Sequence, residues 1–154
     1  MAKARELVGA LSGSTVLLLG DRGPGKTQIA TWLANRRAVA KKSPGRYYRA
    51  VDLFGAIKAT WSERTGTPDQ GAIMERFRTV KFLVIDELNE ALGTSWERQV
   101  FNNILDHRYG SMLTTLLIAN LTEREAEEVL GPSIWTRACE TGGVVICDWP
   151  SYRK

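Results

Sequence analysis

Gly20-Asp-Arg-Gly-Pro-Gly-Lys-Thr27 follows an apolar run at residues 16–19 and precedes a helix-like segment at residues 28–37. Glycines at this spacing let a loop fold closely around a phosphate with its backbone N–H groups pointing inward. The N-terminus of the following helix adds a favourable dipole for an anion. An ordinary glycine-rich turn is the alternative, but the flanking strand and helix favour a phosphate-binding loop. The sequence therefore predicts a nucleoside triphosphate site.

Two residues of the loop have expected chemical roles. Lys26 is expected to reach the β- and γ-phosphates, and the Thr27 hydroxyl is expected to ligate Mg²⁺. ATP or ADP is the expected ligand. The residues expected to line its site are Gly20, Asp21, Arg22, Gly23, Pro24, Gly25, Lys26, Thr27 and Gln28.

The composition fits one globular domain. The chain has 154 residues, of which 44% are hydrophobic and 25% charged, enough for a sizeable core. Its net charge of +4 permits a polyanionic partner without requiring one. Cys139, Cys147 and the lone histidine lack metal-ligand spacing, which argues against a zinc site and for reduced thiols in a cytoplasmic protein. No run is long enough to span a bilayer, so no membrane partner is expected.

Apolar runs alternate with helix-like segments along the chain. Buried parallel strands are expected at 15–19, 81–85, 115–119 and 143–147, with a weaker one at 47–51. Helices are expected at 27–40, 52–64, 70–78, 96–109 and 123–130, and a short amphipathic one at 1–13. Thr94-x-x-Glu97 and Thr122-x-x-Glu125 are capping-box patterns, typical of helix starts. The alternation predicts a three-layer α/β fold with a five-stranded parallel sheet, and ligands beyond the carboxyl ends of its strands.

Polar residues follow two of the expected strands. Asp86 comes directly after an apolar strand and is expected to hold Mg²⁺ directly or through water, while Glu87 is placed to polarise the attacking water. Asn120 closes the run 116–119 and could position that water; a simple turn before Thr122 is the alternative. Strand-end carboxylates that cap a helix or face solvent are common, but the upstream loop favours the metal and water roles. A strand-end glutamate also favours hydrolysis over transfer to a small substrate.

With these motifs the chain resembles the AAA+ ATPase domain of bacterial DnaC-type replicative helicase loaders and IstB-type transposition helpers. The similarity covers about residues 14–153 and implies a P-loop NTPase of the AAA+ additional-strand class. The resemblance implies that residues 14–154 of this chain form the ATPase domain and that no C-terminal lid domain is present. The matching stretches are the phosphate-binding loop, Leu-Val-Ile-Asp86-Glu87-Leu, Trp96-Glu-Arg, Asn102-Asn-Ile-Leu-Asp-His-Arg108, Asn120, residues 130–137 and Asp148-Trp-Pro-Ser-Tyr-Arg153.

The resemblance implies a head-to-tail homo-oligomer with ATP bound between subunits. One subunit would supply Lys26, Thr27, Asp86, Glu87 and Asn120. Its neighbour would supply Arg137, whose guanidinium suits a γ-phosphate in the transition state. A solvated surface position is the alternative for this arginine.

The resemblance also implies contacts with single-stranded DNA. Lys58 and Trp61 are three residues apart and share a helix face, so one could pair with a phosphate while the other stacks on a base. Thr94 and Trp96 match a second contact region of the family. Both tryptophans also continue apolar stripes at helical spacing, so burial in the core is the alternative for each.

The leading hypothesis is a Mg-dependent ATPase of the helicase-loader type that self-assembles and binds single-stranded DNA in replication or mobile-element transactions. The alternative is an ATP-gated adaptor that binds a replicative helicase or transposase and hydrolyses little ATP. Its contact surface would be the N-terminal helix with Trp32, Trp135 or Trp149. A small P-loop kinase is disfavoured because no compact basic lid follows the loop.

Overall fold

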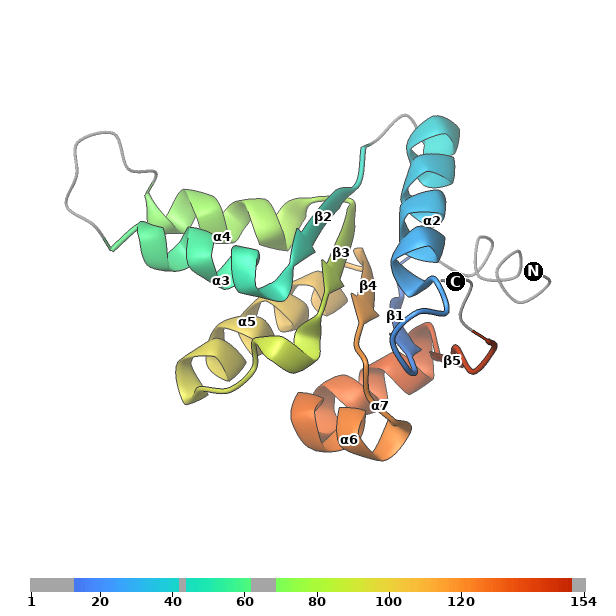
Figure 1. Cartoon of the computed structure of the whole chain (residues 1–154). Helices are drawn as coiled ribbons and strands as arrows, with labels where there is room; N and C mark the ends of the chain where they lie inside the picture. The colour runs from blue at the N-terminus through green and yellow to red at the C-terminus, as the bar shows by residue number, and fades with distance from the viewer. Residues whose placement is uncertain (1–12, 42–43, 62–68, 151–154) are drawn as a thin grey trace.

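The computed structural model describes residues 13–41, 44–61 and 69–150, and Figure 1 shows how they are arranged. The helix expected at 1–13 lies almost wholly outside these residues. A five-stranded parallel sheet has the order β2-β3-β4-β1-β5. Because β4 lies between β1 and β3, the predicted additional-strand arrangement is confirmed. The strands are β1 (Thr15–Leu19), β2 (Arg46–Arg49), β3 (Phe82–Asp86), β4 (Thr114–Ile118) and β5 (Val144–Ile146).

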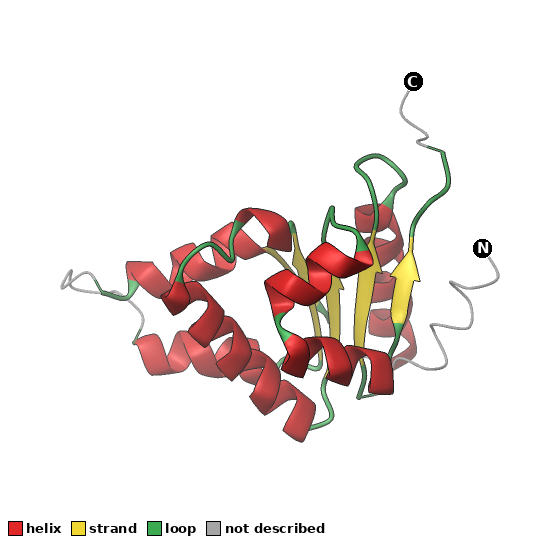
Figure 2. Cartoon of the chain, turned by 90° about the horizontal axis from the view of Figure 1, so that it is seen from below, coloured by secondary structure: helices red, strands yellow, loops and turns green. Residues whose placement is uncertain are grey.

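Helices cover both faces of the sheet (Figure 2), so the predicted three-layer α/β fold is confirmed. Side chains alternate along β1: Leu17 and Leu19 face one hydrophobic core, whereas Val16 and Leu18 face the other. The second core is closed by α2 and the first by the remaining helices. The helices are α2 (Lys26–Lys41), α3 (Ala50–Ala59), α4 (Gln70–Thr79), α5 (Ser95–Gly110), α6 (Glu123–Leu130) and α7 (Pro132–Thr141), with a 3₁₀ turn η1 (Leu88–Glu90).

The helix starts divide into those that the sequence predicted and those that it did not. Both capping boxes are formed, by Thr94 with Glu97 at α5 and by Thr122 with Glu125 at α6. Helix α7 was not expected, although a proline at its first turn after Gly131 is a recognised start signal.

Two of the expected strands need correction. The segment expected at 47–51 is a strand only to residue 49. Helix α3 begins at Ala50, which is buried. The expectation of a buried strand at 143–147 was wrong in burial, since β5 is only partly covered. Both β2 and β5 are edge strands with a single neighbour in the sheet, which leaves one side open.

A buried arginine closes the amino ends of the central strands. Arg108 of α5 is 0% exposed, and its guanidinium donates to Thr115 Oγ1 at 2.8 Å and to the backbone oxygens of Phe77, Val80 and Thr114 at 3.0, 2.8 and 2.6 Å. Burial lowers its pKa to about 10. Arg108 therefore joins α4, α5 and the start of β4 without any carboxylate partner among these contacts.

None of the helices in the described parts of the chain is long and apolar enough to cross a membrane. The expectations about the domain limits and the missing lid stay predictions.

Candidate nucleotide site and tryptophan cluster

The phosphate-binding loop is fixed at both ends by contacts that need its particular residues. Gly20 has φ of 124°, and an added Cβ would lie 2.5 Å from the Cys147 carbonyl oxygen, so only glycine fits. Its N–H donates to the Leu121 carbonyl at 3.1 Å. At the far side, Trp149 Nε1 donates to the Pro24 carbonyl at 2.6 Å. The loop is thereby held between β5, the end of β4 and the start of α2.

Lys26 lies inside this loop. It is 5% exposed, and its ammonium donates to the carbonyl oxygens of Gly20 and Asp21 at 2.7 and 2.5 Å. Burial lowers the pKa of Lys26, an effect that Cys147, Asp86 and Asp21 partly oppose. An ammonium that is held by loop carbonyls is in position to bind phosphate oxygens placed in the same loop.

Thr27 and Asp86 meet between the loop and β3. Thr27 Oγ1 donates to Asp86 Oδ2 at 2.7 Å, and the Glu87 N–H donates to Asp86 Oδ1 at 2.7 Å. Hydroxyl and carboxylate oxygens are suitable ligands for Mg²⁺. Among the described residues no cluster of histidine, cysteine and carboxylate side chains could form an all-protein metal site. The donor set therefore fits an ion that shares phosphate and water ligands.

Tyr47 is a further contact of Asp86. Its hydroxyl donates to Oδ2 at 2.9 Å from the neighbouring strand β2. Burial raises the pKa of Tyr47, and the hydrogen bond to Asp86 adds to this, so the phenol stays protonated as a donor at neutral pH. Tyr47 was not predicted as a site residue, because an exposed aromatic residue on an edge strand carries no sequence pattern that tells where its hydroxyl points.

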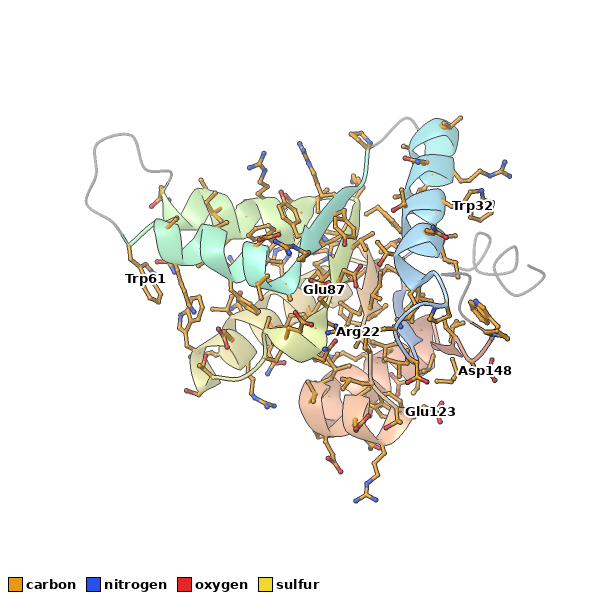
Figure 3. The ribbon with its side chains drawn as sticks, in the orientation of Figure 1. Arg22, Trp32, Trp61, Glu87, Glu123 and Asp148 are labelled. Carbon is orange, nitrogen blue, oxygen red and sulfur yellow. The ribbon has the colours of Figure 1, made fainter. Side chains whose placement is uncertain are left out.

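Glu87 has a strained backbone. Its φ and ψ are 58° and 41°, the left-handed region, which costs a non-glycine residue about 1–2 kcal/mol. Such strain clusters at functional sites, where the surrounding structure holds it in place. Leu88 follows it and is fully buried, which anchors the turn. Figure 3 shows Glu87 and Arg22 on the same side of the molecule, and Arg22 pairs with Glu90 of η1 at 2.6 Å.

Asn120 lies just beyond β4, between the strands that carry the loop and Asp86. Its backbone N–H donates to Asn89 Oδ1 at 3.1 Å. The structure thus brings the loop, Asp86, Glu87 and Asn120 to the carboxyl ends of three adjacent strands, β1, β4 and β3. This is the edge at which the sequence analysis placed the ligand.

Arg137 lies away from these residues, on α7, and has partners within its own chain. It forms an ion pair with Asp106 of α5, and its guanidinium carbon lies 4.8 Å from the centre of the Tyr109 ring. Its side chain is 29% exposed. The role of Arg137 in a neighbouring site stays a prediction, and it would require exchange of Asp106 for phosphate.

The residues predicted to contact DNA form one group, here called the tryptophan cluster: Lys58, Trp61, Thr94 and Trp96. The Trp61 and Trp96 rings pack edge to face with centroids 5.0 Å apart. Lys58 Nζ lies 5.0 Å from the centre of the Trp96 ring and 3.2 Å from Glu97 Oε1. Thr94 caps α5 beside them.

The two tryptophans of this cluster differ in burial. Trp61 is 55% exposed, so its predicted alternative as a core residue is not what the structure shows. Trp96 is half-buried against Phe54, with ring centroids 5.9 Å apart, and therefore belongs partly to the core. The cluster thus combines one exposed indole with a half-buried indole that packs against it.

Comparison with known proteins agrees with this geometry. The family model described as IstB-like ATP binding protein matches residues 11–141. The chain belongs to this family. It is 28% identical over 157 aligned residues to the replicative helicase loader DnaC of Escherichia coli strain K12, an alignment covering 100% of this chain and 63% of that protein. The chain is therefore a member of a family described as ATP-binding, and it is similar to a helicase loader.

Solved structures show the same fold at lower identity. The crystal structure of the DnaC helicase loader is similar with a TM-score of 0.79 at 19% identity, over 94% of this chain and 86% of that chain. The replication initiator DnaA bound to AMPPCP and single-stranded DNA gives a TM-score of 0.77 at 17% identity, over 96% and 44% of the two chains. The chain thus shares the three-layer α/β fold of these two proteins.

Proposed function

We propose that this chain is a Mg-dependent ATPase of the helicase-loader type that self-assembles and binds single-stranded DNA in replication or mobile-element transactions. The observation that supports it most is the 2.7 Å contact between Thr27 Oγ1 and Asp86 Oδ2, because it joins the phosphate-binding loop to the acidic strand. The similarity to DnaC supports the loader class. Since the chain spans only 63% of that relative, the activity of the whole loader is part of the proposal.

In the proposed mechanism the loop and Lys26 bind the phosphates of ATP, and Thr27 and Asp86 hold Mg²⁺. The ion, when bound, neutralises charge on the β- and γ-phosphates. Glu87 orients a water molecule and accepts its proton as the water oxygen attacks the γ-phosphorus, while Asn120 positions that water. The bond between the γ-phosphorus and the bridging oxygen breaks, and ADP and inorganic phosphate leave.

Self-assembly would complete the site. Arg137 of one subunit would reach the γ-phosphate bound by the next, which requires that it give up its ion pair with Asp106. That pair is partly exposed, and such pairs contribute little to stability, so an anionic phosphate can compete for the guanidinium.

The tryptophan cluster supports the DNA-binding part of the proposal. Trp61 offers an exposed indole for base stacking, and Trp96 packs against it. Lys58 adds a cation beside both rings, although Glu97 partly neutralises it. A base–aromatic platform next to a lysine is tolerant of sequence, as expected for a single-stranded DNA contact.

The test is steady-state ATP hydrolysis measured against protein concentration, with and without a single-stranded oligonucleotide. Turnover per chain should rise with concentration, because assembled subunits share sites, and it should respond to DNA. Lys26→Ala should bind no nucleotide and serves as the negative control. Flat turnover that ignores DNA would contradict the proposal.

The ATP-gated adaptor remains the second candidate, and the exposure of Trp32 favours it. Trp32 is 42% exposed on α2, with the Arg36 guanidinium 5.5 Å from its ring. Trp135 instead packs against the core, and the Trp149 indole N–H donates a hydrogen bond to the Pro24 carbonyl. The adaptor predicts slow turnover insensitive to DNA, together with nucleotide-dependent capture of a purified replicative helicase or transposase.

A further inference from the structure

Asp86 accepts hydrogen bonds from α2, from β2 and from the residue that follows it. Oδ2 accepts the Thr27 hydroxyl from α2 at 2.7 Å and the Tyr47 hydroxyl from β2 at 2.9 Å, while Oδ1 accepts the Glu87 N–H at 2.7 Å. A carboxylate held by donors in different directions cannot rotate freely about its Cβ–Cγ bond. The carboxylate plane is therefore set before any ligand arrives.

The Thr27 hydroxyl can keep its hydrogen bond to Asp86 while an oxygen lone pair faces a cation, so Thr27 is itself one of the residues that would hold the ion. The Glu87 N–H belongs to a strained turn that follows Asp86 directly. Tyr47 is the donor that lies outside both the loop and this turn. It belongs to β2, where it pairs with Val84 of β3, the strand that ends at Asp86. Tyr47 is thus the donor that can fix the orientation of the Asp86 carboxylate independently of the ion and of the strained turn.

We propose that Tyr47 is a positioning residue for Mg²⁺ binding, acting through the orientation of the Asp86 carboxylate. The inference rests on the proposed function, because it assumes that Thr27 and Asp86 hold the ion. Hydrogen-bond partners of metal-holding carboxylates typically change metal affinity about 10–100-fold when removed. Since Tyr47 is 44% exposed, its effect belongs at the lower end of that range.

The neighbouring residue supplies a matched control. Tyr48 lies on the same strand, but its side chain points to the opposite face and packs edge to face on Phe77, with centroids 5.0 Å apart. It packs against the hydrophobic core rather than contacting the carboxylate. Tyr47→Phe and Tyr48→Phe each remove one hydroxyl from adjacent positions and keep the ring.

The experiment titrates Mg²⁺ into the full chain with a fluorescent ADP analogue and repeats the binding in EDTA. Tyr47→Phe should need about tenfold more Mg²⁺ to reach half of the metal-dependent affinity gain, with unchanged affinity in EDTA. Tyr48→Phe should match the wild type in both. A Tyr47→Phe midpoint within about twofold of the wild type, or equal to that of Tyr48→Phe, would overturn the inference.

Two further outcomes separate this inference from the proposed function. If wild-type nucleotide binding does not respond to Mg²⁺, the proposed function fails and this inference fails with it. If the wild type responds and Tyr47→Phe loses binding in EDTA as well, Tyr47 supports the fold of the loop, and only the positioning role is overturned.

Discussion

Lys26 and Arg108 are buried cations at opposite ends of the same sheet, and they are held differently. Arg108 is 0% exposed and donates to carbonyls of Phe77, Val80 and Thr114, which lie in or next to regular elements. Lys26 is 5% exposed and donates to two carbonyls of its own loop. Arg108 is thus hydrogen-bonded to the backbone of the fold, whereas Lys26 is hydrogen-bonded to a loop that is expected to bind a ligand.

The difference separates a structural charge from a functional one. The planar guanidinium of Arg108 distributes its donors among fixed acceptors, so no ligand can replace them without breaking the fold. The ammonium of Lys26 is a compact charge whose acceptors lie in a glycine loop, where phosphate oxygens can take their place. Backbone strain does not follow this division, because Glu87 after β3 and Met112 before β4 both have positive φ, 58° and 51°.

The largest expected effect is at the carboxyl end. Glu87→Gln keeps the size and shape of the side chain but removes the base, so turnover should fall about 10²–10⁴-fold while ATP binding persists. Single-turnover hydrolysis and equilibrium ATP binding measure the two quantities. Glu123→Gln, at the exposed start of α6 (Figure 3), is the matched control and should hydrolyse ATP normally. Turnover of Glu87→Gln within threefold of the wild type would remove Glu87 from the mechanism.

At the amino end the expected effect is on stability. Arg108→Met keeps the aliphatic length but leaves buried carbonyls without donors, each costing about 1–3 kcal/mol. We expect the free energy of unfolding to fall by about 3–4 kcal/mol, measured by urea denaturation with tryptophan fluorescence. Arg76→Met, an exposed arginine on α4, should change it by less than about 0.5 kcal/mol. Equal stability of the two variants would show that the Arg108 contacts are not structural.

The sequence predicted the carboxyl end far better than the amino end. At the carboxyl end each polar residue follows its own apolar strand, so Asp86, Glu87 and Asn120 could be placed by strand order alone. Arg108 carried no such signal, because its acceptors Phe77 and Val80 are 31 and 28 residues away in the chain. Long-range partners of this kind depend on how helices pack, which local patterns do not contain.

Side-chain direction was the other limit of prediction. Tyr47 and Arg137 were visible in the sequence, but their bonds to Asp86 and Asp106 cross between elements. Trp61 and Trp96 both fitted an apolar stripe, and only the structure separates an exposed indole from a half-buried one. Periodicity assigns a residue to a face, whereas burial near a helix end depends on what packs there.

The smallest expected effect concerns the tryptophan cluster. Here the comparison is between two exposed indoles, Trp61 in the cluster and Trp32 on α2. Trp61 and Trp32 are 55% and 42% exposed, and Figure 3 shows them on opposite sides of the molecule. Loss of one base–aromatic stack costs about 1 kcal/mol at the low end, or roughly fivefold in affinity. Trp61→Ala should weaken binding of a labelled single-stranded oligonucleotide by that factor in fluorescence anisotropy, with Trp96 left to hold a base.

Trp32→Ala should leave DNA affinity unchanged, because α2 is remote from the junction of α3 and α5 that forms the cluster. No loss in either variant would mean that neither indole stacks on a base and that DNA binding follows the net positive charge of +4. That reading has its own signature, since phosphate-dominated binding weakens steeply with salt, whereas a stacking loss persists at high salt. Comparing the two variants at low and high salt therefore decides whether the exposed face of Trp61 or only the surface charge binds the strand.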